Sequence, residues 1–270
     1  MIDSTATRAE LRREQLVDLV HAGTSDPAGI AEVLGVSLPT VHRDLARLES
    51  EGRIIRGRGR ALTVESAREL SLQEREVTGR PQKIAIATHA AAHVHDGDVV
   101  ILDAGSTVGE LARQLSKGKR ITAVTNGMSA LNALLDARDV ELIITGGRLR
   151  RISRGLVGQQ AEDTIRAITG DRVFLGADGV SSQRGVCETS PEQAALKKLM
   201  IEQARDLYVL ADSSKLETAP SNFWARLDRP WTLVTDSDAT DEQLAGFRSL
   251  DECSVEVVDV AEPKLRSATP

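Results

Sequence analysis

The sequence predicts an α/β protein with an N-terminal winged helix-turn-helix and a C-terminal domain built on a mostly parallel β-sheet. Two observations predict this fold. Residues 8–64 contain three short helical patterns followed by a basic hairpin. From Asp98 onwards, short β-branched runs alternate with helical stretches, which is typical of a sheet covered by helices on both faces. We therefore divide the chain into residues 1–64, a linker helix over 65–80, and a larger domain over 81–270.

The composition allows two domains and excludes several classes of protein. The chain has 270 residues, enough for one large domain or two ordinary ones, and its apolar fraction of 41% is enough for a real core. No apolar run reaches membrane-spanning length, and the N-terminus lacks the apolar segment of a signal peptide. Cys187 and Cys253 form neither a disulfide framework nor a zinc-binding spacing. We therefore expect a cytoplasmic protein with no membrane partner, no metal and no cofactor.

The charge is unevenly distributed. The net charge is −6, yet residues 1–64 hold 9 Lys+Arg against 9 Asp+Glu, and the remainder holds 25 against 31. Residues 53–60 contain four arginines and no acid. A local basic element on an acidic chain favours a small DNA-contacting module over non-specific binding by the whole surface.

The first two helices have clear boundaries in the sequence. An apolar stripe predicts a helix over residues 8–22, which Gly23 ends. Asp26 can cap a second helix that has Pro27 in its first position. Gly35 then permits a tight turn, so the spacing is that of a helix-turn-helix.

The third helix, residues 37–48, is the expected DNA-reading element. Ser37 can act as its N-cap, and Val41, Leu45 and Leu48 form one apolar face. A helix with its back in a core and a cationic front suits the major groove. The candidate DNA contacts are Ser37, Thr40, His42, Arg43 and Arg47. We expect Asp44 to pair with a nearby arginine instead of facing phosphate.

A hairpin should follow this helix. Two β-prone runs lie on either side of Gly57 and Gly59, and the hairpin carries Arg56, Arg58 and Arg60. We expect these arginines to lie against phosphates or in the minor groove. The alternatives are a solvated basic turn and a winged helix that binds another protein. A protein-binding wing has no particular need of three arginines.

The motif S-L-P-T-V-H-R-D-L, followed by L-E-x-E-G-x-I-x-R, resembles the start of DeoR-type bacterial transcriptional regulators. The family's recognition helix reads S-x-x-T-[IV]-x-R-D-L, which the chain matches. The wing departs from the family's R-x-H-G-G-A, because Arg58 and Arg60 stand where His and Gly are usual. His42 replaces a common arginine. The resemblance implies operator DNA as a partner, and the departures leave the target sequence open.

The connector is polar first and apolar later. Residues 65–78 have no strong apolar face, as expected of an exposed linker helix, and a packed helix follows from Pro81. His89 and His93 have the i, i+4 spacing of metal ligands, but no HExxH glutamate accompanies them. We expect His89, His93 and His95 to be surface or capping residues.

The C-terminal domain should be a layered α/β sheet. The expected strands are Val99–Leu102, Ile121–Thr125, Glu141–Thr145, Arg172–Leu175, Leu207–Ala211, Thr232–Thr235 and Val255–Val258. The expected helices between them are 107–116, 127–137, 158–168, 190–205 and 239–246. Ligands of such sheets bind at the carboxyl ends of the strands.

Polar turns follow five of these strands. The turn at 103–107, DAGST, places hydroxyls and free amides at a helix N-terminus, where they attract a phosphate. Any one such turn is explained by turn geometry. Five on one sheet favour a small ligand that carries both a phosphate and several hydroxyl groups.

This half also resembles the DeoR C-terminal domain, through D-A-G-S-T, T-N, G-G, G-A-D-G, E-x-x-x-K-K-x-M-I and A-D-S-S-K. The resemblance implies a fold akin to ribose-5-phosphate isomerase and CoA transferases, and a sugar phosphate as effector. The ligand residues it implies are Asp103, Gly105, Ser106, Thr107, Thr125, Asn126, Gly146, Gly147, Asp178, Glu188 and Lys215.

The rival hypothesis is a sugar-phosphate isomerase-like enzyme with an appended DNA-binding head. Such an enzyme needs a base beside the substrate carbon. The isomerases carry a carboxylate soon after their Asp-Gly, but here Val180, Ser181 and Ser182 follow. Glu188 could be a base or could bind a hydroxyl. We favour a regulator of carbohydrate genes without catalytic residues, and we expect it to be a repressor.

We expect this regulator to be a homo-oligomer that pairs two reading heads on a two-fold operator. The sequence does not identify which sugar phosphate binds, nor whether the protein is a dimer or a tetramer.

Overall fold

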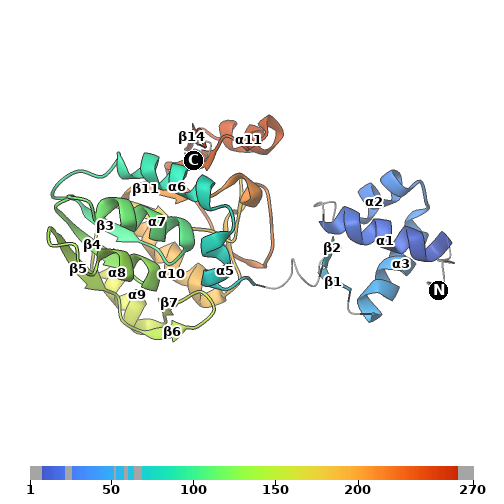
Figure 1. Ribbon diagram of the computed structural model, residues 1–270, viewed down its shortest axis with the longest axis horizontal. Coiled ribbons are helices and arrows are strands. Elements are labelled where there is room, and N and C mark those ends of the chain that lie inside the picture. The colour runs from blue at the N-terminus through green and yellow to red at the C-terminus, as the bar shows by residue number, and fades with distance from the viewer. Residues whose placement is uncertain (1–7, 22–25, 52, 58–59, 64–68, 261–270) are drawn as a thin grey trace, which may run out of the picture. The chain divides into compact units, whose positions relative to one another are not determined.

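The computed structural model describes residues 8–21, 26–51, 53–57, 60–63 and 69–260 (Figure 1). The chain divides into two compact units, Met1–Glu69 and Leu70–Pro270. Within the described ranges, no helix is long and apolar enough to cross a membrane.

The first unit is the predicted winged helix-turn-helix. Its elements are α1 (Arg8–His21), α2 (Pro27–Leu34), α3 (Leu38–Ser50), β1 (Ile54–Gly57) and β2 (Arg60–Thr63). Asp26 accepts a hydrogen bond from the amide of Gly29, and Gly35 adopts φ 62° at the end of α2, as the sequence predicts. The antiparallel pair β1–β2 confirms the hairpin.

The apolar face of α3 forms the centre of this unit. Val41, Leu45 and Leu48 are buried, as predicted, and pack with Leu16 and Ile30 of the two preceding helices. One prediction is wrong in part. Ser37 occupies the N-cap position, but its hydroxyl bonds to the Thr40 hydroxyl at 2.9 Å instead of accepting from a backbone amide. The exposed hydroxyl finds a side-chain partner one turn on.

The second unit is built on a seven-stranded parallel sheet (Figure 1). Its order is β14-β13-β11-β8-β3-β4-β5, and every neighbouring pair is parallel. All seven predicted strands are present, with ends shifted by up to three residues. Their bounds are β3 (Val99–Leu102), β4 (Ile121–Thr125), β5 (Val140–Ile144), β8 (Gly170–Leu175), β11 (Ala204–Leu210), β13 (Trp231–Asp236) and β14 (Cys253–Val258).

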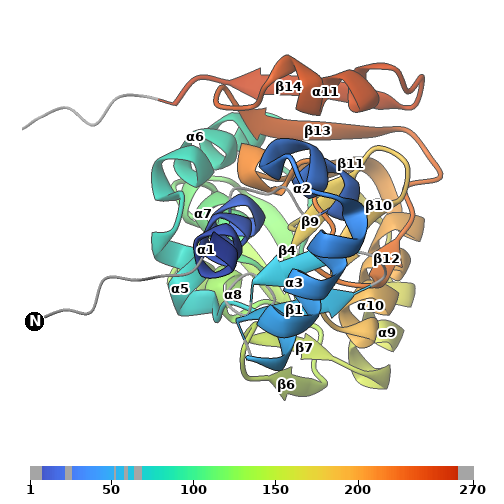
Figure 2. The same ribbon diagram turned by 90° about the vertical axis from the view of Figure 1, so that its right-hand side faces the viewer.

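Helices cover both faces of this sheet (Figure 2). One face packs against α6 (Arg80–Ala91), α7 (Ser106–Leu115) and α8 (Met128–Leu134). The other packs against α9 (Gln159–Arg166), α10 (Pro191–Glu202) and α11 (Asp241–Arg248). Successive side chains of a strand point to opposite faces, so Val100 and Leu102 enter one core and Ile101 the other.

Short elements that the sequence did not predict are inserted at the ends of the strands. A hairpin, β6 (Arg148–Arg150) and β7 (Gly155–Val157), follows β5. A small sheet joins β9 (Gly179–Ser181), β10 (Gly185–Glu188) and β12 (Phe223–Ala225). A 3-10 turn, Ser213–Lys215, follows β11.

The sequence predicts one linker helix over 65–80. Residues 65–68 lie outside the described residues, and residues 69–80 do not form one continuous helix. Helix is present over α5 (Leu72–Val77), and α6 begins separately at Arg80. Ser71 and Glu74 form a capping box that starts α5. Leu72 is buried and its amide donates to the Ile152 carbonyl at 2.8 Å, so one side of α5 packs on the rest of the second unit, while Val77 at its end is exposed.

Candidate functional site

The first candidate site is the outer face of α3. Ser37, His42, Arg43 and Arg47 are exposed and Thr40 is half-buried, whereas the opposite face of the helix is in the core. The helix therefore presents a polar, cationic surface to solvent. Arg43 donates to the Pro39 carbonyl and the Thr40 hydroxyl, at 3.3 and 3.4 Å.

Asp44 lies on the inner side of α3, where its carboxylate forms an ion pair within the first unit. Its Oδ2 lies 2.6 Å from Nε of Arg12 on α1, which confirms the predicted pairing with an arginine. The Asp44 hydrogen bond raises the pKa of the Arg12 guanidinium. The pair ties α1 to α3 and keeps the carboxylate away from the exposed face.

The two arginines of the exposed face differ in their partners. Arg47 forms an i, i+4 ion pair with Glu51, with Nε–Oε1 at 2.6 Å. In the part of the chain that the structure describes, Arg43 contacts a carbonyl and a hydroxyl but no carboxylate. Arg43 therefore carries the more available positive charge.

The wing arginines are placed through the backbone of the hairpin. Arg56 lies on β1 opposite Ala61, and Arg60 lies on β2 opposite Gly57. The structure describes the backbone of Arg56 and Arg60 but not their side chains, and Arg58 is not among the described residues.

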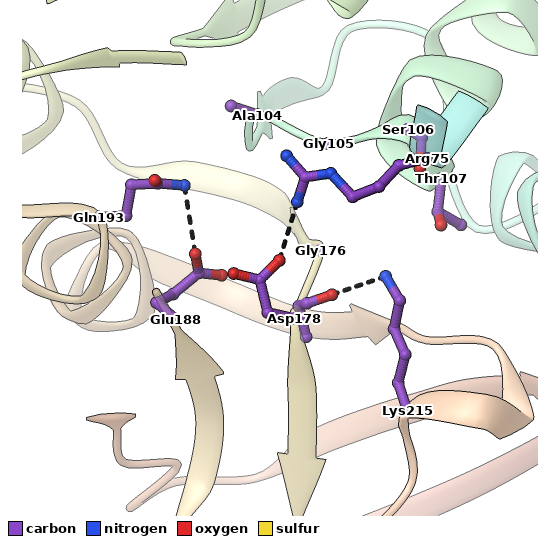
Figure 3. A pocket seen from close by; sticks show the side chains of 11 residues that line it. Arg75, Ala104, Gly105, Ser106, Thr107, Gly176, Asp178, Glu188, Gln193 and Lys215 are labelled. Atoms are coloured by element: carbon purple, nitrogen blue, oxygen red, sulfur yellow. Dashed lines mark hydrogen bonds and ion pairs between the residues drawn. The ribbon is translucent and has the colours of Figure 1, made fainter. Parts of the chain in front are cut away.

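The second candidate site is a pocket at the carboxyl ends of β3, β8 and β11, with about 290 Å³ of empty space that includes the solvent at its mouth (Figure 3). Six of the eleven predicted ligand residues line it: Gly105, Ser106, Thr107, Asp178, Glu188 and Lys215. Arg75, Gln193 and the backbone at Ala104, Gly176 and Ala177 complete the lining.

One side of the pocket can hold an anion. Ser106 and Thr107 begin α7, whose first amides have no partner within the helix. Lys215 reaches in from the turn after β11, and its Nζ donates to the Ala177 carbonyl at 2.6 Å. Hydroxyls, amides and an ammonium group therefore line one pocket, and together they are a donor set suited to a phosphate.

Asp178 and Arg75 form an ion pair in the lining of the pocket (Figure 3). Asp178 Oδ1 is 2.8 Å from Arg75 Nη1, and its Oδ2 accepts from the Thr189 hydroxyl at 2.6 Å. Burial would raise the pKa of Asp178, but the charge of Arg75 and the bond from Thr189 hold it below its usual value. Asp178 is therefore a carboxylate that can accept from a ligand hydroxyl.

A buried ionic cluster lies behind the pocket. Lys197, on α10, donates to Asp103 and to the Gly176 carbonyl, and lies 3.0 Å from Oε1 of Glu188. Lys197, Asp103 and Glu188 are each at most 3% exposed. Burial raises the pKa of Glu188, opposed by the charge of Lys197, while the two carboxylates raise the pKa of Lys197 against the effect of burial.

Two polar atoms of the pocket lining have no hydrogen-bond partner among the described residues. These are Nε of Arg75 and Oε1 of Gln193. Gln193 uses its amide nitrogen to donate to Glu188 at 3.2 Å. An unpaired buried donor and acceptor in the same pocket are suited to a ligand that carries both an anion and hydroxyls.

The helix that carries Arg75 is held by a buried lysine. Lys83 Nζ donates to the carbonyls of Arg75 and Thr78, each at 2.6 Å, at the end of α5. Burial, and then the nearby charge of Lys215, lower the pKa of Lys83 to about 8. The backbone of α5 is thus fixed by Lys83 while its Arg75 side chain reaches the pocket.

The other five predicted ligand residues do not line the pocket. Asp103 lies directly behind it, paired with Lys197. Thr125 donates to the Leu102 carbonyl and accepts from the Gly127 amide, and Asn126 donates to the Leu156 carbonyl, so both hold the chain after β4. Gly146 and Gly147 turn the chain with positive φ, and a side chain at Gly147 would meet the Val157 carbonyl at 2.6 Å.

Sequence reasoning missed three residues of the site: Arg75, Gln193 and Lys197. The Ser71–Glu74 capping box was a readable signal for α5, although nothing in the sequence placed Arg75 near Asp178. Lys197 follows Leu196 and precedes Met200 on a helix whose apolar positions are buried. A lysine at such a position indicates a buried charge pair.

Family models match both units of the chain. The "DeoR-like helix-turn-helix domain" matches residues 12–67, and the "DeoR C terminal sensor domain" matches residues 79–237. The chain belongs to the DeoR family. It is therefore a DNA-binding transcriptional regulator with a sensor domain.

Relatives that match most of the chain agree with this assignment to the DeoR family. The putative aga operon transcriptional repressor of Escherichia coli O157:H7 is 34% identical, over 96% of this chain and 97% of that protein. The transcriptional repressor GlcR of Bacillus subtilis is 34% identical, over 77% and 80%. The lactose phosphotransferase system repressor of Lactococcus lactis subsp. lactis is 28% identical, over 87% and 94%.

Similar solved structures are more distant. Ribose 5-phosphate isomerase A from Methanocaldococcus jannaschii is 20% identical, over 49% of this chain and about half (52%) of that chain, with a TM-score of 0.37. A translation initiation factor eIF-2B of Pyrococcus horikoshii OT3 is 17% identical, over 80% and 68%, with a TM-score of 0.39.

The DeoR assignment decides between regulator and enzyme. The matched family and the relatives' names are those of regulators. The isomerase-like alternative is therefore not favoured.

Proposed function

We propose that this DeoR-family regulator represses genes of carbohydrate metabolism and releases its operator when a sugar phosphate enters the pocket of the second unit. One observation carries the proposal. Lys215 and the start of α7 supply anion-binding groups, and the carboxylates Asp178 and Glu188 line the same pocket. Arg75 adds a second cation, which is paired with Asp178. A ligand with a phosphate at one end and hydroxyls at the other satisfies both kinds of group.

The names of the relatives support the class of target genes. One relative is named a repressor of the aga operon, and another is named a repressor of the phosphotransferase system for the sugar lactose. Because the present chain is similar to these relatives over most of its length, we assign its operators to carbohydrate genes and its action to the cytoplasm.

For the DNA side we propose that α3 lies in the major groove. Thr40, His42 and Arg43 would face base edges, and Ser37 and Arg47 the flanking backbone. Arg56, Arg58 and Arg60 of the hairpin would bind phosphates or the adjacent minor groove. A two-fold operator then requires two reading heads, so we propose that the chain works as a homo-oligomer.

Arg75 supplies the link between the two functions. It belongs to α5, the first helix of the second unit, and its charge is shared with Asp178. An arriving phosphate would compete with Asp178 for this guanidinium, because a phosphate dianion is the stronger partner. Loss of the Arg75–Asp178 pair would remove one of the contacts that hold α5, the helix that follows the connector to the DNA-reading unit in the chain. Release then requires tighter ligand binding by the DNA-free arrangement.

A thermal-shift screen against pentose and hexose phosphates tests the proposal. A ligand that binds the native state raises the melting temperature, by an amount that grows with its concentration. We expect one sugar phosphate to raise the melting temperature, and the same sugar without its phosphate to leave the melting temperature unchanged. Lys215→Ala should lose the shift, whereas Lys198→Ala, which alters an exposed lysine of α10, should keep it. No shift with any phosphate, or equal shifts in both variants, would contradict the assignment of this pocket.

A further inference from the structure

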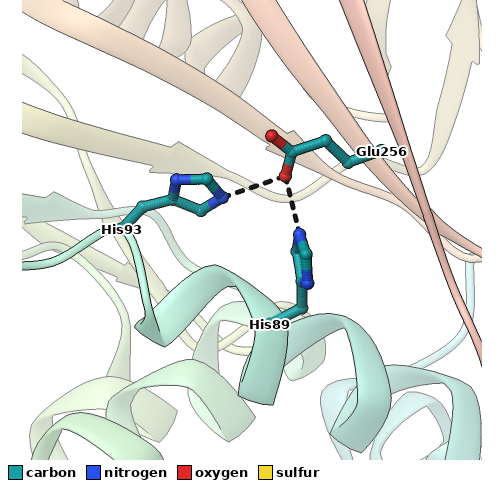
Figure 4. A group of neighbouring side chains, drawn as sticks. All are labelled: His89, His93 and Glu256. Atoms are coloured by element: carbon teal, nitrogen blue, oxygen red, sulfur yellow. Dashed lines mark hydrogen bonds and ion pairs between the residues drawn. The ribbon is translucent and has the colours of Figure 1, made fainter.

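A second cluster of ligating side chains lies away from the pocket, on the side of the sheet that α6 covers (Figure 4). His89 lies in the last turn of α6, His93 follows the end of that helix, and Glu256 lies on the edge strand β14. None of the three lines the pocket. The sequence analysis expects surface or capping histidines. His89 is exposed and His93 is half-buried, and both also contact a carboxylate more than 160 residues away.

The three side chains converge on one point. Nε2 of His89 is 2.8 Å from Oε2 of Glu256, and Nε2 of His93 is 2.9 Å from the same oxygen. The possible ligand atoms of the three residues lie within 4.8 Å of one another. Figure 4 shows both rings directed at the carboxylate from below and from the side.

We propose that His89, His93 and Glu256 form a binding site for a divalent transition metal ion, with Zn²⁺ the best match. Two imidazole nitrogens and one carboxylate oxygen are a donor set that binds zinc, nickel and copper better than it binds magnesium or calcium. A tetrahedral ion with bonds of about 2.1 Å holds its ligands about 3.4 Å apart. The two nitrogen–oxygen distances therefore need to widen by only about half an ångström.

Part of the site is already held in position. The ring of His93 lies against Tyr208, with centroids 4.9 Å apart, and Tyr208 stacks on Phe174 in the core. The His93 carbonyl accepts from Arg172 at 2.9 Å, which fixes the chain just after α6. A ligand held by packing costs less entropy to order when the metal binds.

The site is also open to solvent. The side chains of His89, His93 and Glu256 are 43%, 28% and 29% exposed. Three protein ligands leave a fourth tetrahedral position, which water can fill at this exposure. The ion would join α6 to the outermost strand of the sheet, and would stabilise the second unit without entering the sugar-phosphate pocket.

The test uses the full-length, untagged protein after treatment with a chelator. We expect calorimetric titration with ZnCl₂ to give one ion per chain, and the melting temperature to rise with zinc. Co²⁺ should give visible d–d bands of nitrogen ligation, which a purely structural histidine would not produce. His89→Ala, which removes the most exposed ligand, should weaken zinc binding by more than about ten-fold, because even the loss of a group that only hydrogen-bonds to a metal ligand costs about 10–100-fold. Glu256→Gln should also weaken it.

His95→Ala is the matched control, because His95 lies near the cluster but faces Asp98, at 3.8 Å. It should bind zinc as the wild type does. The proposal is overturned if zinc does not bind or gives no cobalt bands. It is equally overturned if His89→Ala and Glu256→Gln bind the ion as tightly as His95→Ala does.

Discussion

Arg75 and Asp178 form an ion pair, with Nη1 and Oδ1 2.8 Å apart, that joins the first helix of the second unit to the end of β8. Both side chains are largely buried, at 14% and 12% exposure, so the pair is little screened by solvent. Lys83 holds the backbone of the same helix through two carbonyls. The side chain of Arg75 can therefore respond to a ligand charge while its helix stays folded.

Arg75→Met should uncouple the ligand from DNA. The substitution keeps much of the side chain's length but removes the charge that a phosphate would capture. We expect saturating sugar phosphate to release operator from the wild type and to have little effect on the variant, as measured by fluorescence anisotropy. Arg248→Met, which breaks an exposed pair with Asp241 on α11, is the control. Full release from the Arg75 variant would show that the signal takes another route.

Arg43 and Arg47 should differ in their effect on operator binding. Arg43→Ala should lower the salt dependence of the operator affinity by about one unit of log–log slope, since it removes one cation near DNA. Arg47→Ala should have a smaller effect, because Glu51 already neutralises Arg47. Titrations at several salt concentrations measure both slopes. Equal slopes for the wild type and the Arg43 variant would remove Arg43 from the interface.

Lys197→Met should destabilise the second unit strongly. Asp103 and Glu188 would keep their buried positions without the ammonium group that lies between them. Removing one partner from a buried charge cluster typically costs about 3–5 kcal/mol. Urea unfolding measures the loss, and Lys198→Met, one residue along and exposed, should stay within about 0.5 kcal/mol of the wild type. A Lys197 variant as stable as the Lys198 variant would rule out the electrostatic role of the cluster.

Lys83 should leave a signature in the pH dependence of stability. Burial lowers its pKa in the folded protein to about 8, from an ordinary value of 10.5. The folded state therefore binds this proton less tightly than the unfolded state, and the penalty disappears as the pH rises through that window. The free energy of unfolding of the wild type, relative to Lys83→Met, should increase between about pH 8 and 10.5. A flat or falling difference would contradict the buried position of the ammonium group.

The elements that were predicted well are those with local signals. The helix-turn-helix follows from the cap at Asp26, the turn at Gly35 and the spacing of Val41, Leu45 and Leu48. The seven strands follow from apolar runs, because a parallel sheet buries both faces of its strands. Such signals span at most a dozen residues, so one sequence is enough to read them.

The elements that were missed depend on contacts between distant residues. Arg75 meets Asp178 across 103 residues, and His93 meets Glu256 across 163. Thr125 lies at the end of a strand, as a ligand residue would. Its hydroxyl, however, donates to the Leu102 carbonyl of β3 and accepts from the Gly127 amide. The short strands β9, β10 and β12 have three or four residues each, too few for a periodic pattern.

The central claim is that one ligand and the operator bind this protein in opposition. The most direct measurement is the affinity for the sugar phosphate found in the screen, with and without a saturating operator duplex selected in vitro. Because coupling between two binding sites is reciprocal, the duplex should weaken sugar-phosphate binding by the same factor by which the sugar phosphate weakens binding of the duplex. An affinity for the ligand that is the same on and off DNA would contradict the account.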